Sequence, residues 1–151
     1  MQVPENHPRQ RVFFYVEGRL KEKAKDAFAV LARELVGMRK WTLDPPRPFD
    51  VSGQDSALAD QGFVPPEAVG LSMEVYSALP PVTLPKEIDQ QHLDEVRTVI
   101  AKLCEFSQAN RVNFEVGLDE RFVGSITRGN MDRTLSEGLL GEWERHLNAL
   151  E

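Results

Sequence analysis

The chain has 151 residues, of which 41% are hydrophobic, and it carries a formal net charge of −6 at pH 7. A domain of this size buries roughly 68–70% of the surface that its unfolded chain exposes, which is enough for one stable core over residues 1–151. The one cysteine, Cys104, excludes an intramolecular disulfide, and no apolar run of the sequence approaches the ~18 residues of a membrane span. These features exclude a disulfide-stapled secreted domain and a transmembrane protein, and we expect a cytoplasmic protein without a signal peptide.

The charge is unevenly distributed along the chain. Residues 1–48 carry 10 basic and 6 acidic side chains, whereas residues 49–120 carry 4 basic and 13 acidic ones. Binding to nucleic acid requires a positive patch, so the acidic middle argues against a nucleic-acid partner. It favours a basic protein partner, although an acidic balance also serves simply to keep a protein soluble.

The first third of the chain predicts one strand and one helix. Residues 1–10 contain two prolines and no apolar periodicity, which predicts a loose lead-in. Residues 12–16 are β-branched or aromatic throughout and predict a strand that Gly18 ends. From Leu20 onward apolar residues recur at helical spacing, and Gly37 stands where a left-handed glycine would end the helix.

Residues 38–68 are predicted to form a long proline-rich loop. The segment holds five prolines and two glycines, and only residues 41–43 suggest a short strand. Loops of this length within a compact domain are usually functional or disordered. Trp41 and Phe63 favour a loop that packs onto the domain, because disordered segments are poor in aromatic residues. A disordered insertion is the alternative.

The middle of the chain predicts a second strand and a second helix. Residues 69–76 alternate between apolar and polar or small side chains, which predicts a strand with one buried face. Asp89 is predicted as the N-cap of the helix, because Ile88 before it is spaced to meet Leu93. Asn110 is predicted to end this helix in a left-handed conformation.

The last part of the chain predicts a hairpin followed by an amphipathic helix. Residues 112–118 alternate in polarity, two acidic residues interrupt the pattern, and residues 122–126 resume it. Apolar residues then recur at helical spacing from Leu135 to Leu150. The order of elements, strand–helix–loop–strand–helix–strand–strand–helix, predicts a single-domain α+β fold. We expect a two-layer sandwich with three helices on one face of a mixed sheet of four to five strands.

The sequence does not bring together the groups that nucleophilic or metal catalysis requires. Cys104 lies in the predicted second helix and is expected to pack against the core. The histidines at positions 7, 92 and 146 share no metal-ligand spacing with each other or with Cys104. Glu142 and His146 lie one helical turn apart, which is more typical of a surface pair. Because nucleotide-binding and calcium-binding motifs are also missing from the sequence, we predict no catalytic residue, no metal site and no cofactor, and favour a non-catalytic protein.

Carboxylates and aromatic residues are predicted to share the open face of the sheet. Glu74 and Glu115 fall on the polar faces of their strands, and Glu17 joins them if those strands are neighbours. Tyrosine supplies contact area at a protein interface, and acidic groups steer a basic partner. A solvated sheet face without a partner is the simpler interpretation. The predicted partner-binding surface, which includes two residues of the long loop, is Tyr15, Glu17, Trp41, Phe63, Glu74, Tyr76, Asn113 and Glu115.

We therefore expect a protein-binding module that masks a basic partner protein. Small acidic α+β proteins without a catalytic motif resemble the immunity proteins that neutralise bacterial toxins, and the resemblance here is one of size, charge and missing motifs. It implies an inhibitor function and a toxin as the partner. Two alternatives stay open: a small ligand-binding domain or enzyme with a pocket between residues 38–68 and the sheet, and a homo-oligomeric structural subunit such as a homodimer.

Charge reversal tests the sheet-face hypothesis. Changing Glu74 and Glu115 together to Lys should slow association with a basic partner and weaken its salt dependence, because acids on the face steer the encounter. The association rate constant, measured against ionic strength for the partner that co-purifies from the native host, checks this. Partner binding that the double reversal leaves untouched would contradict the hypothesis.

Overall fold

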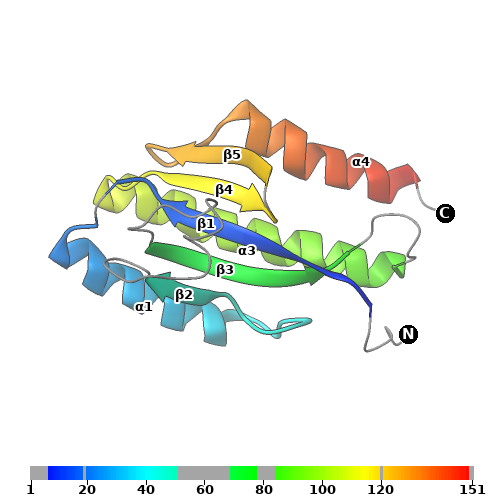
Figure 1. Ribbon diagram of the computed structural model, residues 1–151, viewed down its shortest axis with the longest axis horizontal. Helices are drawn as coiled ribbons and strands as arrows, with labels where there is room; N and C mark the ends of the chain where they lie inside the picture. The colour runs from blue at the N-terminus through cyan, green and yellow to red at the C-terminus, as the bar shows by residue number, and fades with distance from the viewer. Residues whose placement is uncertain (1–6, 19, 51–68, 78–83, 120, 150–151) are drawn as a thin grey trace.

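The structure is a computed structural model that describes residues 7–18, 20–50, 69–77, 84–119 and 121–149 (Figure 1). It confirms the α+β class, because the chain contains both helices and the strands of one sheet. In chain order the elements are β1 (Arg9–Val16), α1 (Glu22–Met38), β2 (Arg47–Asp50), β3 (Val69–Tyr76), α3 (Lys86–Asn110), β4 (Phe114–Leu118), β5 (Arg121–Thr127), β6 (Asn130–Met131), η1 (Thr134–Gly141) and α4 (Glu142–Ala149).

The described strands form one open sheet in the order β2-β3-β1-β4-β5-β6, and every neighbouring pair is antiparallel. The prediction of a mixed sheet with four to five strands is therefore wrong in both respects. The helices do connect strands of the same direction, β1 to β2 through α1 and β3 to β4 through α3. Another strand lies between the members of each pair, however, so no parallel neighbours result. The two additional strands, β2 and β6, are short edge elements with little sequence signal, and β2 contains Pro48.

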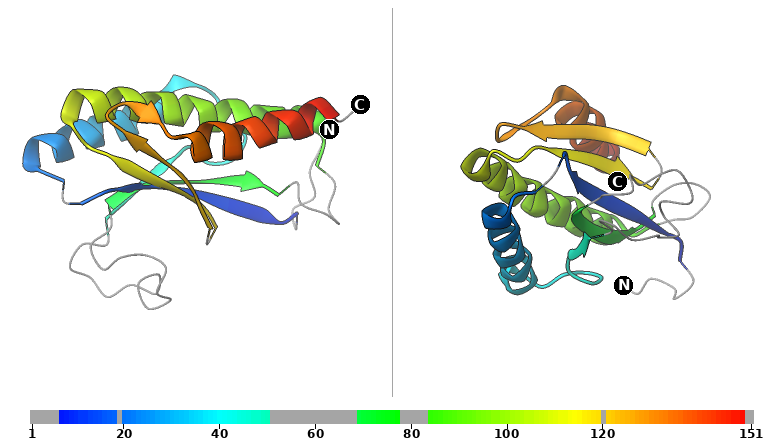
Figure 2. Two further views of the ribbon diagram at one scale, coloured as in Figure 1. Left: turned by 90° about the horizontal axis from the view of Figure 1, so that it is seen from above. Right: turned by 60° about the vertical axis from the view of Figure 1, so that its left-hand side comes forward.

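The helices α1, α3 and α4 lie together on one side of the sheet, as predicted (Figure 2). Alternate residues of the strands point to that side, because successive side chains of a strand point to opposite faces. Phe14 of β1, Leu71 of β3 and Phe114 of β4 are fully buried there. The helical stripes predicted from the sequence supply the opposite wall of the core, with Ala24, Phe28, Leu31 and Leu35 from α1 and Leu93, Val96, Ile100 and Leu103 from α3.

The predicted helix ends are wrong by a few residues. Helix α1 continues through Gly37 to Met38, and Arg39 after it is extended, with φ −160°. Helix α3 begins at Lys86, so Asp89 lies within its first turn instead of capping it. At the other end of α3 the left-handed residue is Arg111, with φ 55°. None of the described helices contains an apolar stretch long enough to cross a bilayer.

The segment predicted as a long loop is partly structured. Residues 41–43 do not form the suggested strand, and the strand in this segment is β2, which pairs with β3. With four residues, β2 is too short to show a periodic pattern in the sequence. Its pairing with β3 holds it in the sheet. Residues 51–68, including Phe63, lie outside the described residues.

The predicted hairpin and last helix are present, with two irregular features. The β4–β5 pairing shifts register between Val116 and Gly117, and the neighbouring residues Val123 and Gly124 of β5 are both buried. The last helix begins as the π-helix η1, in which the Glu142 N–H donates to the carbonyl of Glu137 five residues earlier. Such wide helical turns are rare and are found mostly at functional sites.

A methyl group at position 124 should destabilise the protein. Gly124 has φ +147°, and a Cβ there would lie 2.6 Å from Leu135 Cα, so η1 would have to move away from β5. We expect Gly124→Ala to lower the free energy of unfolding by about 1–3 kcal/mol, measured by urea denaturation. Gly37→Ala is the matched control. It lies in α1 with open space around it, and should raise the free energy of unfolding by roughly 0.5–1 kcal/mol. Equal effects of the two changes would contradict this account.

Candidate functional site

The structure brings four of the predicted surface residues onto the sheet face that carries no helix. Tyr15 stands opposite Glu115 in the β1–β4 pairing, and Glu74 stands opposite Arg11 in the β1–β3 pairing. Tyr76 lies two residues beyond Glu74, so alternation puts it on the same side, but it stands at the end of β3 and its ring also meets the His92 ring of α3 at 5.7 Å. For these four residues the alternation within the strands agrees with the pairing, whereas the prediction also put Glu17 and Asn113 on this face.

Two arginines offset the charge of Glu74 on this face. Arg9 Nη1 donates to one carboxylate oxygen of Glu74 at 2.9 Å, and Arg11 Nη2 donates to the other at 3.0 Å. The hydrogen bond from Arg9, together with that from Arg11, lowers the pKa of Glu74 below its usual value. The Arg9 guanidinium also lies 5.6 Å from the centre of the Tyr76 ring. A face with paired charges gives less support to a basic partner than the sequence alone suggested.

Tyr15 belongs to a cluster of aromatic rings on the same face. Its ring stacks on Phe13 at 5.5 Å and meets the edge of Phe49 at 5.6 Å. Burial raises the pKa of Tyr15 to about 12, because the phenolate loses hydration there. Tyr15 is consequently neutral at any physiological pH.

The remaining predicted residues lie elsewhere. Glu17 is exposed just beyond β1, and its backbone N–H donates to the carbonyl of Asn113 at 2.8 Å. The Asn113 side chain accepts from the Arg128 N–H and so braces the hairpin. Trp41 packs against the core, and its indole N–H donates to the Leu35 carbonyl at 3.0 Å. Trp41 is therefore a structural residue that anchors the chain after α1.

A buried polar relay connects α3 to the sheet edge and to the segment after α1. His92 and Glu95 are 0% and 1% exposed, and the His92 Nδ1–H donates to Glu95 at 3.0 Å. The Tyr76 backbone N–H lies 3.2 Å from His92 Nε2, and since an N–H can only donate, Nε2 is the acceptor and Nδ1 carries the proton. The second oxygen of Glu95 accepts from the Thr42 N–H at 2.6 Å and the Thr42 hydroxyl at 2.9 Å. Both ring nitrogens of His92 are thus occupied, and neither contacts a thiol or hydroxyl nucleophile.

The described residues offer little to nucleophilic or metal chemistry. Burial raises the pKa of Cys104, which lowers the fraction of reactive thiolate at neutral pH. No group of three or more His, Cys, Asp or Glu side chains in the described part of the chain is arranged to hold a metal ion.

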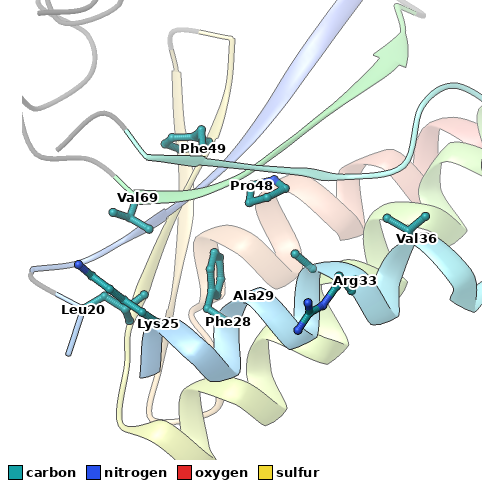
Figure 3. Close-up of a pocket in the computed structure, with 10 residues that line it drawn as sticks. Leu20, Lys25, Phe28, Ala29, Arg33, Val36, Pro48, Phe49 and Val69 are labelled. Carbon is teal, nitrogen blue, oxygen red and sulfur yellow. The ribbon is translucent and has the colours of Figure 1, made fainter. Parts of the chain in front are cut away.

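A groove of about 510 Å³ lies between α1 and the sheet edge formed by β2 (Figure 3). Phe28 and Ala32 are buried residues of α1 at its base, and β2 forms the opposite wall, with Pro48 on the side of α1 and the Phe49 ring on the other side of the strand (Figure 3). Lys25 and Arg33 are its two charged lining residues, and no acidic side chain of the described residues lines it. We call it the α1–β2 groove, and its lining is Leu20, Lys25, Phe28, Ala29, Ala32, Arg33, Val36, Pro48, Phe49 and Val69.

The sequence did not predict this groove or the relay. The spacing of eight residues between Lys25 and Arg33, which leaves them about 80° apart around a helix, is the one available sign that the two border the same groove. The other wall is β2, which has no pattern of its own. For the relay, the sign was a His and a Glu spaced by three residues next to the apolar stripe of α3.

Comparison with family models, with curated proteins and with solved structures finds no match to this chain.

The relay predicts a specific dependence of stability on pH. Burial alone would raise the pKa of Glu95, but the hydrogen bonds from His92 and Thr42 together outweigh it and hold that pKa below the ordinary 4.5. Because the folded pKa is depressed, the stabilising effect of the Glu95 charge is present above pH 4.5 and is lost as the pH falls through the folded pKa. Glu95→Gln should cost about 1–3 kcal/mol at pH 7, and less at pH 3.

Urea denaturation between pH 7 and pH 3 measures this difference. Glu105→Gln is the control on the same helix, because the Glu105 side chain is 70% exposed and its ion pair with Lys102 is a surface pair. We expect its effect to stay within about 0.5 kcal/mol at every pH. A cost of Glu95→Gln that does not change with pH would exclude the carboxylate charge as its cause.

Proposed function

We propose that the protein is a non-catalytic binding domain and that the α1–β2 groove holds a single-chain anionic amphiphile, that is, a carboxylate on an apolar tail. One observation carries the proposal. The groove is lined by eight apolar residues and two charged ones, and both charged residues are basic. One wall of the groove is β2, which lies within residues 38–68. The sequence analysis left open a ligand pocket between those residues and the sheet.

The size and lining of the groove suit such a ligand. Small-molecule sites typically measure 300–1,000 Å³ and have mostly apolar walls with a few placed polar groups. The volume of about 510 Å³ lies within this range. Phe28 of α1 and Pro48 of β2 offer apolar surfaces from opposite sides, and each Å² of apolar surface that the tail buries contributes roughly 25 cal/mol (Figure 3).

The local charge of the groove is positive although the whole chain is negative. Lys25 and Arg33 are exposed on one face of α1, about 12 Å apart along the helix axis at 1.5 Å per residue. Neither Asp26 nor Glu34, the acidic residues that follow these two in sequence, is among the residues that line the groove. An anionic head group that binds beside either cation therefore meets no opposing carboxylate in the described lining.

The absence of catalysis is supported by the state of the groups that would perform it. His92 is fully committed to Glu95 and to the Tyr76 amide, so it has no free nitrogen with which to activate a nucleophile. Burial raises the pKa of the Cys104 thiol, which makes it a poor nucleophile.

A protein partner on the open sheet face is the second candidate function. Phe122, opposite Gly117 in the β4–β5 pairing, is 59% exposed on this face, and large exposed aromatics are typical of protein interfaces. This candidate keeps the immunity-type masking function proposed from the sequence. The balanced charges around Glu74 make shape and aromatic contact more important to it than attraction to a basic partner.

Ligand titration tests the groove. We expect dodecanoate to bind the purified full chain saturably and to displace a fluorescent fatty acid, with 1-dodecanol of the same chain length at least tenfold weaker, because only the carboxylate meets Lys25 and Arg33. The double variant Lys25→Gln, Arg33→Gln should raise the Kd for dodecanoate about tenfold, equivalent to about 1.4 kcal/mol. The pair Lys23→Gln, Lys40→Gln is the control, because it removes the same charge from exposed residues outside the groove.

A steric variant separates the groove from other apolar surfaces. Ala29 is exposed and lines the groove, so Ala29→Trp should fill it without unfolding the domain, and thermal unfolding checks that. Dodecanoate binding should then be lost. Binding that survives Ala29→Trp, or that does not distinguish dodecanoate from dodecanol, would refute the groove as an anion site.

A further inference from the structure

A second pocket lies where the end of the sheet meets α3 and α4. Its volume is about 480 Å³, and Val75, Leu118 and Leu139 are among the apolar residues of its wall. Helix α4 lies on the β5 side of the sheet, whereas α1 lies on the β2 side, so this pocket is on the other half of the molecule from the α1–β2 groove (Figure 1). We call it the α3–α4 pocket.

One buried carboxylate, that of Asp89, lines this mostly apolar pocket, together with two exposed ionisable residues of α4, Glu142 and His146. Asp89, His92 and Glu95 are spaced by three residues along α3 and form a buried polar row, with Asp89 2% exposed. Glu95 and His92 satisfy one another and reach the backbone of their neighbours. Asp89, in contrast, accepts one hydrogen bond, from the Trp143 indole N–H at 2.7 Å, and no Lys or Arg of the described residues forms an ion pair with it.

We propose that the α3–α4 pocket binds a small organic cation, a protonated amine on an apolar body, with Asp89 as its counter-ion. A carboxylate removed from water is costly unless it is hydrogen-bonded and paired with a positive charge. The N-terminal turn of α3 offsets part of this cost through the helix dipole, and Trp143 supplies one donor. A cationic group in the pocket supplies Asp89 with the positive partner that no described Lys or Arg supplies.

The aromatic residues of the pocket fit the same ligand. Trp143 and Tyr76 both line it, and an aromatic face attracts a cation within about 6 Å of its centre. The hydrogen bond to Asp89 holds the Trp143 indole in place, so its ring is positioned before a ligand arrives. The apolar wall is suited to burying the uncharged part of the ligand.

The backbone beside the pocket has an irregularity of its own. Gly138 and Leu139, which line the pocket, belong to the π-helix η1. A π-helix has poorer geometry than an α-helix and is retained mostly where function requires it. Its position is fixed at the start by Asp132, whose carboxylate accepts from the Leu135 N–H at 2.8 Å, and by the close approach of Leu135 to Gly124. The contacts that position η1 are therefore independent of the Asp89 carboxylate on the other side of the pocket.

Three ligands of nearly equal shape test the proposal by calorimetry at pH 7 on the full chain. They are 2-phenylethylamine, 2-phenylethanol and phenylacetate, which are cationic, neutral and anionic. We expect the amine to bind saturably, the alcohol to bind at least tenfold more weakly, and phenylacetate to bind more weakly still. Equal affinities for the amine and the alcohol, or no saturable binding of the amine at millimolar concentration, would overturn the proposal.

The variant Asp89→Asn isolates the charge. Asparagine keeps the size of the side chain and an oxygen that can accept from Trp143, so we expect about a tenfold loss of amine affinity, unchanged affinity for the alcohol and an undiminished Tm. Asp94→Asn, on an exposed position of α3, is the control and should leave all affinities unchanged. A merely structural role for Asp89 would weaken the amine and the alcohol equally, which contradicts the proposal. If Asp89→Asn does not fold, the comparison of the cationic, neutral and anionic ligands on the unchanged protein decides whether the proposal holds.

The two ligand proposals stand apart. Dodecanoate binding in the α1–β2 groove should be unaffected by Asp89→Asn, and amine binding should be unaffected by Ala29→Trp. Either site can therefore fail without affecting the test of the other.

Discussion

The buried carboxylate of Glu95 is the interaction on which the arrangement of this domain depends. Desolvating an ion of this kind costs several kcal/mol, and only a full set of donors offsets it. Three groups of two residues supply the donors: the ring of His92 on the same helix, and the backbone N–H and hydroxyl of Thr42 in the segment that follows α1. His92 in turn accepts from the Tyr76 N–H, at a part of β3 that β2 does not reach. One ion therefore fixes the position of α3 relative to both the sheet edge and α1.

Helix α3 serves as the spine of the domain because it combines an apolar and a polar row. Its apolar stripe packs on the sheet, and the polar row of Asp89, His92 and Glu95 lies beside that stripe and is equally buried. Two members of the row are satisfied within the protein. The third, Asp89, is held by Trp143 of α4, which makes the contact between α3 and α4 both a structural joint and the wall of a pocket. The same geometry thus stabilises the last helix and creates the place where we infer that a cation binds.

Charge along the chain and charge in space are different quantities in this protein. The middle of the sequence is strongly acidic, yet on the sheet face Glu74 lies opposite Arg11 and is bonded to Arg9, two residues of the basic N-terminal part. On α1 the reverse occurs, because Lys25 and Arg33 line the groove while no acidic residue of the described chain does. Antiparallel pairing and helical rotation, more than net charge, decide which surfaces attract anions or cations.

The sequence by itself determined the elements that carry a strong period: strands β1, β3, β4 and β5, the apolar stripes of α1 and α3, and the α+β class. It also determined which faces of the strands carry Tyr15, Glu74 and Glu115, since alternation within a strand is a local property. Tertiary structure alone decided the order and direction of the strands, the short edge strand β2, the inward position of Asp89 and the π-helical start of the last helix. The physical reason is that these features are stabilised by partners distant in sequence. Pro48 lies in a strand because β3 is beside it, and Leu135 begins a π-helix against Gly124, an approach that no local pattern records.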